Sequence, residues 1–193
     1  MSEAGGTTSA LRAVLGDHEA RDRREKADLE RIRSVITHGQ PWARTSPLHV
    51  TGSAIVIDQG TGRVLLRWHA RMRAWMQVGG HAERGEYDPW HIALREAREE
   101  TGLPDLQGWP ADGGCRPVQV VIVPVPAHGD EPAHEHADIR YLLSTERPEM
   151  AVAESPDTPL RWLALDDALD AVVEDNLKEY LRRARTLLRT ESF

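Results

Sequence analysis

The spacing of hydrophobic positions changes once along the chain, and this change separates a helical N-terminal part from a part rich in strands. From about Thr8 to His38, leucine, valine and isoleucine recur at helical spacings on either side of a heavily charged stretch. We predict two helices here, divided near residues 16–17 and ended by the Gly-Gln-Pro sequence at 39–41. The segment carries no recognisable chemistry. Two interpretations stay open: an accessory helical hairpin, or an arm that pairs two chains in a homodimer.

From His49 onward the pattern is that of strands interrupted by helices. Residues 49–58 and 63–70 are rich in β-branched and other apolar side chains, and the Gln-Gly-Thr-Gly sequence between them predicts a hairpin. We expect a third short strand at 74–78 that stops at Gly79 and Gly80. A helix is then predicted from about Pro89 to Thr101.

The second half of the chain predicts three more strands and two more helices. Residues 117–126 form a Val-rich run with little polar alternation, so we assign 118–125 entirely to the core. Residues 137–146 alternate better and are expected to run antiparallel to that run, and residues 159–165 form the last strand. Asp166 is expected to cap a helix that extends through Val173, and residues 176–190 form a closing Arg-rich helix.

This mixture of elements predicts an α/β (α+β) protein with a mixed β-sheet sandwiched between helices. We expect two parts, an N-terminal helical extension over residues 1–44 and a domain over residues 45–193 that includes the C-terminal helix.

Composition narrows the class of protein. The 193 residues are 40% hydrophobic and 28% charged, as in ordinary globular proteins, and no apolar run is long enough to span a membrane. The N-terminus lacks the pattern of a signal peptide, and the single cysteine, Cys115, can form neither an internal disulfide nor a Cys-based zinc site. We therefore expect a cytoplasmic protein. The net charge of −7 argues against a nucleic acid polymer as partner.

The stretch from Gly79 to Leu103 carries the candidate chemistry. Asp88 suits the N-cap of the predicted helix, Pro89 its first position and Gly102 the position after its end. At 100° per residue, the helix places on one face the residues Trp90, Leu94, Ala97 and Thr101. The opposite face then presents three carboxylates, those of Glu96, Glu99 and Glu100.

Three like charges this close repel one another, so a cation is expected among them. Mg²⁺ or Mn²⁺ fits best, because these ions prefer carboxylate and carbonyl oxygens and share their shell with phosphates. An isolated Glu-x-x-Glu-Glu sequence is more often a solvated acidic face. In this chain the residues around the three glutamates favour a metal site over a solvated acidic face.

The stretch resembles the Nudix box, G-x5-E-x7-R-E-U-x-E-E-x-G-U, where U is a bulky apolar residue. Gly80 is followed at the required distance by Glu86, and the tail reads Arg-Glu-Ala-Arg-Glu-Glu-Thr-Gly-Leu over residues 95–103. Two features depart from the pattern: Ala97 replaces the bulky residue, and the spacer at 87–94 has eight residues rather than seven. The longer spacer puts the role of Glu86 in doubt more than the roles of the three helix glutamates.

The resemblance extends from about residue 47 to residue 169, and it implies the fold of the Nudix hydrolases, which include MutT-like proteins. It implies hydrolysis of a nucleoside diphosphate linked to a further group, with Mg²⁺ or Mn²⁺ as cofactor. It also assigns roles to residues of the box. Glu99 and Glu100 would bind the metal, Glu96 would bind metal or help to deprotonate water, the Gly80 carbonyl would add a ligand, and Arg95 would orient a glutamate.

Substrate contacts are sought outside the helix. The region from 67 to 73 carries four candidates for phosphate contacts, namely Arg67, His69, Arg71 and Arg73. Arginine makes up 22 of the 24 basic residues of the chain, so the preference for arginine in this region is by itself weak evidence for phosphate binding. Later in the chain, alternating positions aim at one face His134, His136 and Asp138. Our substrate-binding set is Arg67, Arg71, His81, His136 and Asp138, while Glu135, His136 and Asp138 compete as the late residue that completes the site. Trp68 and Trp75 are assigned to the core or rim rather than to base stacking.

The sequence therefore predicts a metal-dependent pyrophosphohydrolase for a small nucleoside-diphosphate-type substrate whose second group stays open. Two alternatives remain. One is a non-catalytic module that binds a nucleotide as a sensor. The other is an enzyme similar to isopentenyl-diphosphate isomerases, which share the fold, carry a His/Glu metal site and depend on a catalytic cysteine; the surroundings of Cys115 do not match theirs.

Overall fold

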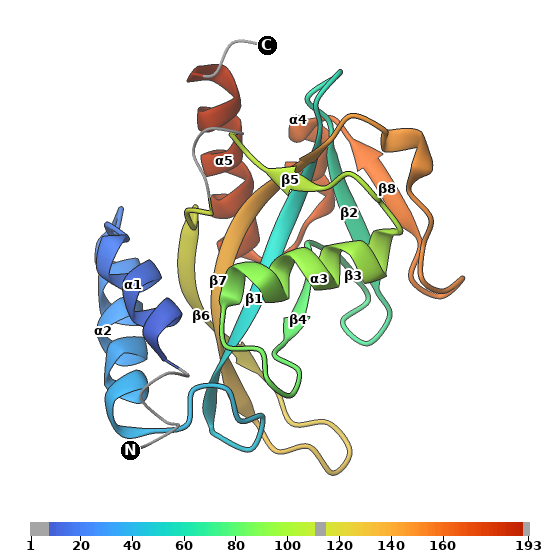
Figure 1. The fold of residues 1–193 in the computed structure, drawn as a ribbon. Coiled ribbons are helices and arrows are strands. Elements are labelled where there is room, and N and C mark those ends of the chain that lie inside the picture. Colours follow the sequence, from blue (N-terminus) through green and yellow to red (C-terminus); the bar gives the residue numbers. More distant parts are fainter. Residues whose placement is uncertain (1–7, 111–114, 191–193) are drawn as a thin grey trace.

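The computed structural model of the protein describes residues 8–110 and 115–190. It contains a mixed β-sheet with helices packed on both faces (Figure 1). In chain order, the elements are α1 (Ser9–Asp17), α2 (Arg23–His38), β1 (Leu48–Asp58), β2 (Val64–His69), β3 (Ala74–Met76), β4 (Val78–His81), α3 (Pro89–Thr101), β5 (Gln107–Gly108), β6 (Gln119–Val125), β7 (His134–Thr145), the 3₁₀ helix η2 (Pro148–Met150), β8 (Leu160–Leu163), α4 (Leu165–Ala171) and α5 (Asp175–Thr190).

The sheet is built around β1, which pairs with three other strands. It runs antiparallel to β2 and β4 and parallel to β7, with pairing from Leu48–Glu135 to Asp58–Thr145. β6 runs antiparallel to β7, as the sequence predicts, while β3 and β8 pair with β2 and β5 pairs with β7.

Alternate side chains of β1 enter two separate cores. Ala54 and Val56 pack with apolar residues of α1, α2 and α3, whereas Ile55 and Ile57 pack with those of α4 and α5. The helices therefore cover both faces of the sheet, and the predicted sandwich is confirmed.

The second N-terminal helix, α2, packs along the edge strand β6, and α1 packs on α2 (Figure 1). Carboxylates of α2 accept hydrogen bonds from backbone amides of that strand: Val120 N–H donates to Glu25 at 2.9 Å, and Ile122 N–H donates to Asp28 at 3.0 Å. An edge strand whose backbone N–H groups are hydrogen-bonded in this way has fewer free N–H groups with which a strand of another chain could pair. The apolar face of α1 and α2 is buried within the same chain, so the hydrophobic pattern alone does not require a second copy. The homodimer stays a prediction.

A buried ion pair joins α2 to the C-terminal helix. Nη1 of Arg183 lies 2.8 Å and 3.0 Å from the two carboxylate oxygens of Glu25, and each side chain is 3% exposed. Burial alone would raise the pKa of Glu25. Hydrogen bonds from His18, from the amides of Arg21 and Val120, and from Arg183 outweigh burial and lower this pKa to about 2.

Three local predictions are corrected by the structure. The strand expected to stop at Gly79 and Gly80 instead breaks at Gln77, and β4 passes through both glycines because they pair with Ser53 and Gly52 of β1. Asp166 does not cap α4: the N-cap is Ala164, and Asp166 lies in the first helical turn. The run 118–125 is not entirely core, because its last residues, Val123 to Val125, border a cavity.

We predict that Arg183→Ala lowers the free energy of unfolding by ~3–5 kcal/mol, because it leaves the Glu25 carboxylate buried without its cation. The matched control is Arg182→Ala on the exposed side of the same helix, which we expect to change stability by ~1 kcal/mol or less. Urea unfolding followed by circular dichroism measures both. Equal stability losses in the two variants would contradict a role for the buried pair in holding α2 to α5.

Candidate active site

The helix of the predicted box, α3, forms as expected and packs directly against β1. Oδ1 of Asp88 accepts a hydrogen bond from the Trp90 amide at 2.9 Å, Pro89 opens the helix, and Gly102 follows it with φ 65°. The approach depends on Gly52 of β1: a Cβ there would lie 2.4 Å from the carbonyl oxygen of Pro89. A side chain at Gly52 would push the helix away from the strand that supports it.

The three helix carboxylates do not share one exposed face, which corrects the prediction from helical geometry. The side chain of Glu99 is 51% exposed, that of Glu96 is 17% exposed and that of Glu100 is 12% exposed. Glu100 turns toward the sheet, where the Gly79 amide donates to its Oε2 at 3.0 Å and Arg67 Nη1 lies 3.1 Å from its Oε1. A backbone donor and a cation thus make burial of this carboxylate tolerable.

Glu96 lies against the second glycine of β4. A Cβ at Gly80 would lie 2.3 Å from Oε1 of Glu96, so only glycine leaves room for this carboxylate. Burial raises the pKa of Glu96, and it raises the pKa of Glu100 to about 7 against the opposing effects of Arg67 and the Gly79 amide. Two carboxylates held close together at raised pKa form a donor set that a divalent cation would favour.

Arg95 connects the carboxylates on the outer side of the helix. Its guanidinium donates to both oxygens of Glu86, at 2.9 Å and 3.0 Å, to Glu99 at 2.7 Å and to Glu96 at 3.1 Å, and also to the carbonyl oxygen of His81 at 2.8 Å. The eight-residue spacer therefore does not displace Glu86 from the arginine. One planar cation fixes the positions of three carboxylates and the end of β4.

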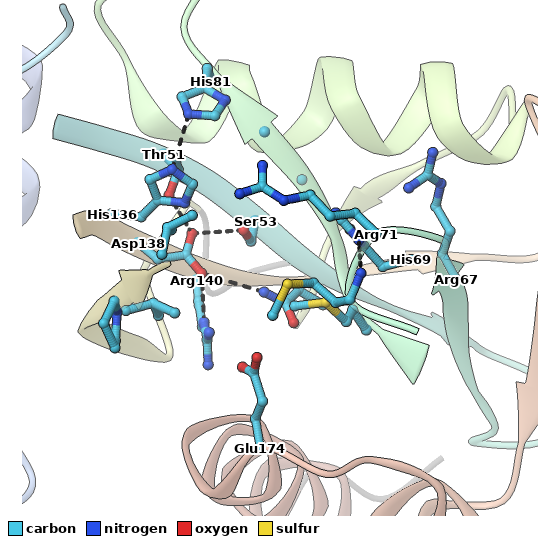
Figure 2. A pocket seen from close by; sticks show the side chains of 18 of the residues that line it. Thr51, Ser53, Arg67, His69, Arg71, His81, His136, Asp138, Arg140 and Glu174 are labelled. Carbon is cyan, nitrogen blue, oxygen red and sulfur yellow. Dashed lines mark hydrogen bonds and ion pairs between the residues drawn. The ribbon is translucent and has the colours of Figure 1, made fainter. Parts of the chain in front are cut away.

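A cavity of about 290 Å³ lies beside Gly79 and Gly80 of β4, which we call the glycine pair. Its lining residues include members of β1, β2, β4, β6 and β7 (Figure 2). All five predicted substrate-binding residues line it, namely Arg67, Arg71, His81, His136 and Asp138. Gly80 and Glu100 line it as well, whereas Glu96, Glu99 and Arg95 are not among its lining residues. The predicted residues thus form two adjoining groups that meet at Gly80 and Glu100.

Asp138 is already fully engaged by its neighbours. Its Oδ1 accepts from the hydroxyls of Thr51 at 2.9 Å and Ser53 at 2.7 Å, and its Oδ2 accepts from Arg140 at 2.7 Å and Gln77 at 3.4 Å (Figure 2). A carboxylate with four donors organises the cavity wall rather than acting as a free base.

Several other candidates lie away from the cavity. Glu135 points to α2, where its carboxylate pairs with Arg31 at 2.6 Å, and Arg73 is not among the lining residues. Trp68 and Trp75 contact each other edge to face, with ring centroids 5.5 Å apart, and Trp75 packs on the core. Cys115 lies near the loop between α1 and α2 and does not line the cavity.

Sequence reasoning missed His49 and gave His134 only as a candidate. Imidazoles of His49, His81, His134 and His136 form a cluster at one end of the cavity. Burial lowers the pKa of His81 to about 3 and that of His136 to about 4, so these rings are neutral at physiological pH. The polar alternation of His49, Thr51 and Ser53 along an otherwise apolar strand is the signal that could have revealed the missing residue.

The protein is thus an α+β protein in which carboxylates of α3 contact Gly79 and Gly80 of β4 beside a polar cavity. A family model described as the NUDIX domain matches residues 47–184, and the chain belongs to the Nudix family. Over 109 residues the chain is 31% identical to a protein of Lactococcus lactis subsp. cremoris named probable DHNTP pyrophosphohydrolase. This alignment covers 56% of the chain and 61% of the relative, so the chain spans under two thirds of that protein's length.

Solved structures share the fold. A Caenorhabditis elegans Ap4A hydrolase in a binary complex superposes with a TM-score of 0.57 at 18% identity, over 74% of this chain and 98% of the other. The Escherichia coli dihydroneopterin triphosphate pyrophosphohydrolase superposes with a TM-score of 0.55 at 18% identity, over 72% of this chain and 94% of the other. The predicted fold and family are therefore confirmed. In the described residues, no helix is long and apolar enough to cross a membrane.

Proposed function

We propose that the protein is a metal-dependent pyrophosphohydrolase that cleaves a nucleoside diphosphate linked to a further group, by attack of water at phosphorus. The observation that carries the proposal is the set of three helix glutamates, two of which are held against Gly79 and Gly80 at the edge of the cavity. The names of the Lactococcus lactis and Caenorhabditis elegans proteins, a probable DHNTP pyrophosphohydrolase and an Ap4A hydrolase, support hydrolysis of a phosphoanhydride bond.

We propose Glu96, Glu99, Glu100 and the Gly80 carbonyl as ligands of Mg²⁺ or Mn²⁺. The donor set fits a hard cation, since all four groups offer oxygen and the space between Gly80 and Glu96 is kept free of a Cβ. When bound, such an ion neutralises diphosphate charge and lowers the pKa of a coordinated water.

The chain's own residues supply the remaining steps. Glu96, whose pKa burial raises, would serve either as a metal ligand or as the group that accepts the proton of the attacking water, while Arg95 keeps Glu96, Glu99 and Glu86 in position. Arg67 and Arg71 lie in the cavity wall, where a guanidinium can bind two oxygens of one phosphate. We also propose residues 45–193 as the catalytic domain, residues 1–44 as its helical extension, and a reducing cytoplasm as the setting for a chain with one cysteine.

The decisive experiment is release of phosphate or pyrophosphate from a panel of nucleoside diphosphate derivatives, Ap4A among them, tested beside the pterin triphosphate DHNTP. We expect turnover with Mg²⁺ or Mn²⁺ and loss of turnover when EDTA removes the ion. Tight binding of a nucleotide without turnover under any metal condition would contradict hydrolysis and would favour a sensor.

We predict that Glu99→Gln and Glu100→Gln each reduce kcat/KM by at least ~10²-fold, because each removes one negative ligand of the ion. Glu149→Gln, at an exposed position outside the cavity, is the matched control and should retain wild-type kinetics. Steady-state kinetics on the best substrate of the panel, with circular dichroism to verify folding, makes the comparison. Unchanged turnover in both helix variants would refute the assigned roles.

We predict that Gly80→Ala reduces kcat/KM by ~10²-fold, because the added Cβ would lie 2.3 Å from Oε1 of Glu96 and must displace that carboxylate. Gly60→Ala provides the control, since its Cβ would meet Asp58 Oδ1 at 3.4 Å, an ordinary contact. Both variants are assayed over a range of Mg²⁺ concentrations. If Gly80→Ala were as active as Gly60→Ala, the close contact between Glu96 and β4 would be irrelevant to catalysis.

A further inference from the structure

Four histidines from three strands converge at the end of the cavity opposite Arg67. Strand pairing explains why they meet: His49 of β1 lies beside His136 of β7, and Thr51, two residues on from His49, lies beside His81 of β4. Side chains at alternate positions of a strand share a face, so His134 joins the same group from β7. Figure 2 shows the rings of His81 and His136 meeting above Asp138.

The nitrogens rather than the ring faces make the closest contacts. Nε2 of His81 lies 3.1 Å from Nε2 of His49 and 3.1 Å from Nε2 of His136. Nε2 of His134 lies 3.1 Å from that of His136. Ligand atoms of His49, His81 and His136 all lie within 4.8 Å of one another. In a tetrahedral site with Zn–N bonds of about 2.0–2.1 Å, ligand nitrogens are separated by roughly 3.3 Å.

Hydrogen bonding among neutral rings cannot account for all of these contacts. Nδ1 of His49 faces the Ser46 carbonyl at 2.9 Å, and Nδ1 of His134 faces the Pro132 carbonyl at 2.9 Å. A carbonyl accepts only, so both Nδ1 atoms carry the proton and both Nε2 atoms present lone pairs to the cluster.

Only His81 and His136 then remain as donors. Each neutral ring offers one proton at Nε2, so at most two of the three N···N contacts can be hydrogen bonds. A metal cation bound among the rings could instead accept a lone pair from several Nε2 atoms at once. The carbonyl partner of His49 is also the kind of outer contact that orients a histidine ligand in a metal site.

We propose that His49, His81 and His136 hold a borderline transition-metal ion through their Nε2 atoms, with Zn²⁺ as the ion to test. Imidazole nitrogen favours zinc, copper, iron and nickel over magnesium, so this site differs in chemistry from the carboxylate site on α3. The ion would join β4, β1 and β7 at the cavity wall. His81 and His136 would then act as metal ligands rather than as direct contacts to the substrate.

The test measures zinc bound by the full-length protein after removal of metals with dipicolinate. Zn²⁺ is added back in excess Mg²⁺, unbound metal is removed by gel filtration, and bound zinc is counted by mass spectrometry. We expect one tightly held zinc per chain and a higher Tm in its presence. Failure of the wild-type protein to retain zinc at micromolar concentration would overturn the proposal.

Variants locate the site. His81→Gln and His136→Gln should each weaken zinc binding by at least ~10²-fold, since even loss of an outer partner weakens metal sites by 10–100-fold. His91→Gln, a largely exposed histidine on α3, is the matched control, and Glu99→Gln should retain zinc because it belongs to the carboxylate site. Zinc affinity unchanged in His81→Gln and His136→Gln would refute the ligand assignment.

A spectrum of the wild-type protein gives a readout that does not depend on whether the variants fold. Co²⁺ bound by few nitrogen ligands in a near-tetrahedral site absorbs strongly in the visible range, and Zn²⁺ should abolish this absorption. An octahedral Co²⁺ spectrum would contradict the site. None of these measurements uses catalytic turnover, so a protein that failed to hydrolyse any diphosphate could still bind zinc, and the two proposals fail independently.

Discussion

Close contact between a helix and two strands is the constraint on which the site depends. Gly52 of β1 and Gly80 of β4 carry no Cβ that would push α3 away, and Gly79, with φ 147°, leaves room for the backbone of β1 at Ser53. Helix carboxylates can therefore reach strand backbone: Glu100 accepts from the Gly79 amide, and Glu96 rests on Gly80. The same contact carries an electrostatic cost, because it brings acidic groups out of water. Arg95 and Arg67 offset much of that cost in the folded chain.

The sheet itself supplies the second half of the site. In-register parallel pairing of β1 with β7 places the polar residues of one strand beside those of the other, so that Thr51 and Ser53 reach Asp138. A shift of one residue would turn these side chains into the apolar core and is strongly disfavoured. The polar residues that line the cavity are thus fixed by the same strand pairing that buries Ile55 and Ile57 further along the same face of β1.

The sequence was most informative where one local pattern dictates one local structure. The bounds of α3 follow from Asp88, Pro89 and Gly102, whose capping roles need no knowledge of the rest of the chain. Contacts between distant segments were harder to foresee. The orientation of Glu100 depends on a strand amide and on Arg67, and the meeting of His49 with His81 and His136 depends on strand register. Helical periodicity contains neither fact, which is why it placed Glu100 on the exposed face.

Two donor chemistries adjoin one cavity, and their separation has a physical consequence. Oxygen donors on α3 favour hard ions that exchange water readily and bind phosphates, whereas imidazoles on the sheet favour ions that bind nitrogen tightly. Because Gly80 lies next to His81 in the sequence, the end of β4 belongs to both groups, and Arg95 bonds to the carbonyl oxygen of His81. Arg95 also donates to Glu96 and Glu99, so the same guanidinium contacts the end of β4 and two of the helix carboxylates. One short strand between β1 and α3 therefore contacts both groups, with the imidazole of His81 in the histidine cluster and its backbone carbonyl bonded to the arginine that orders the carboxylates.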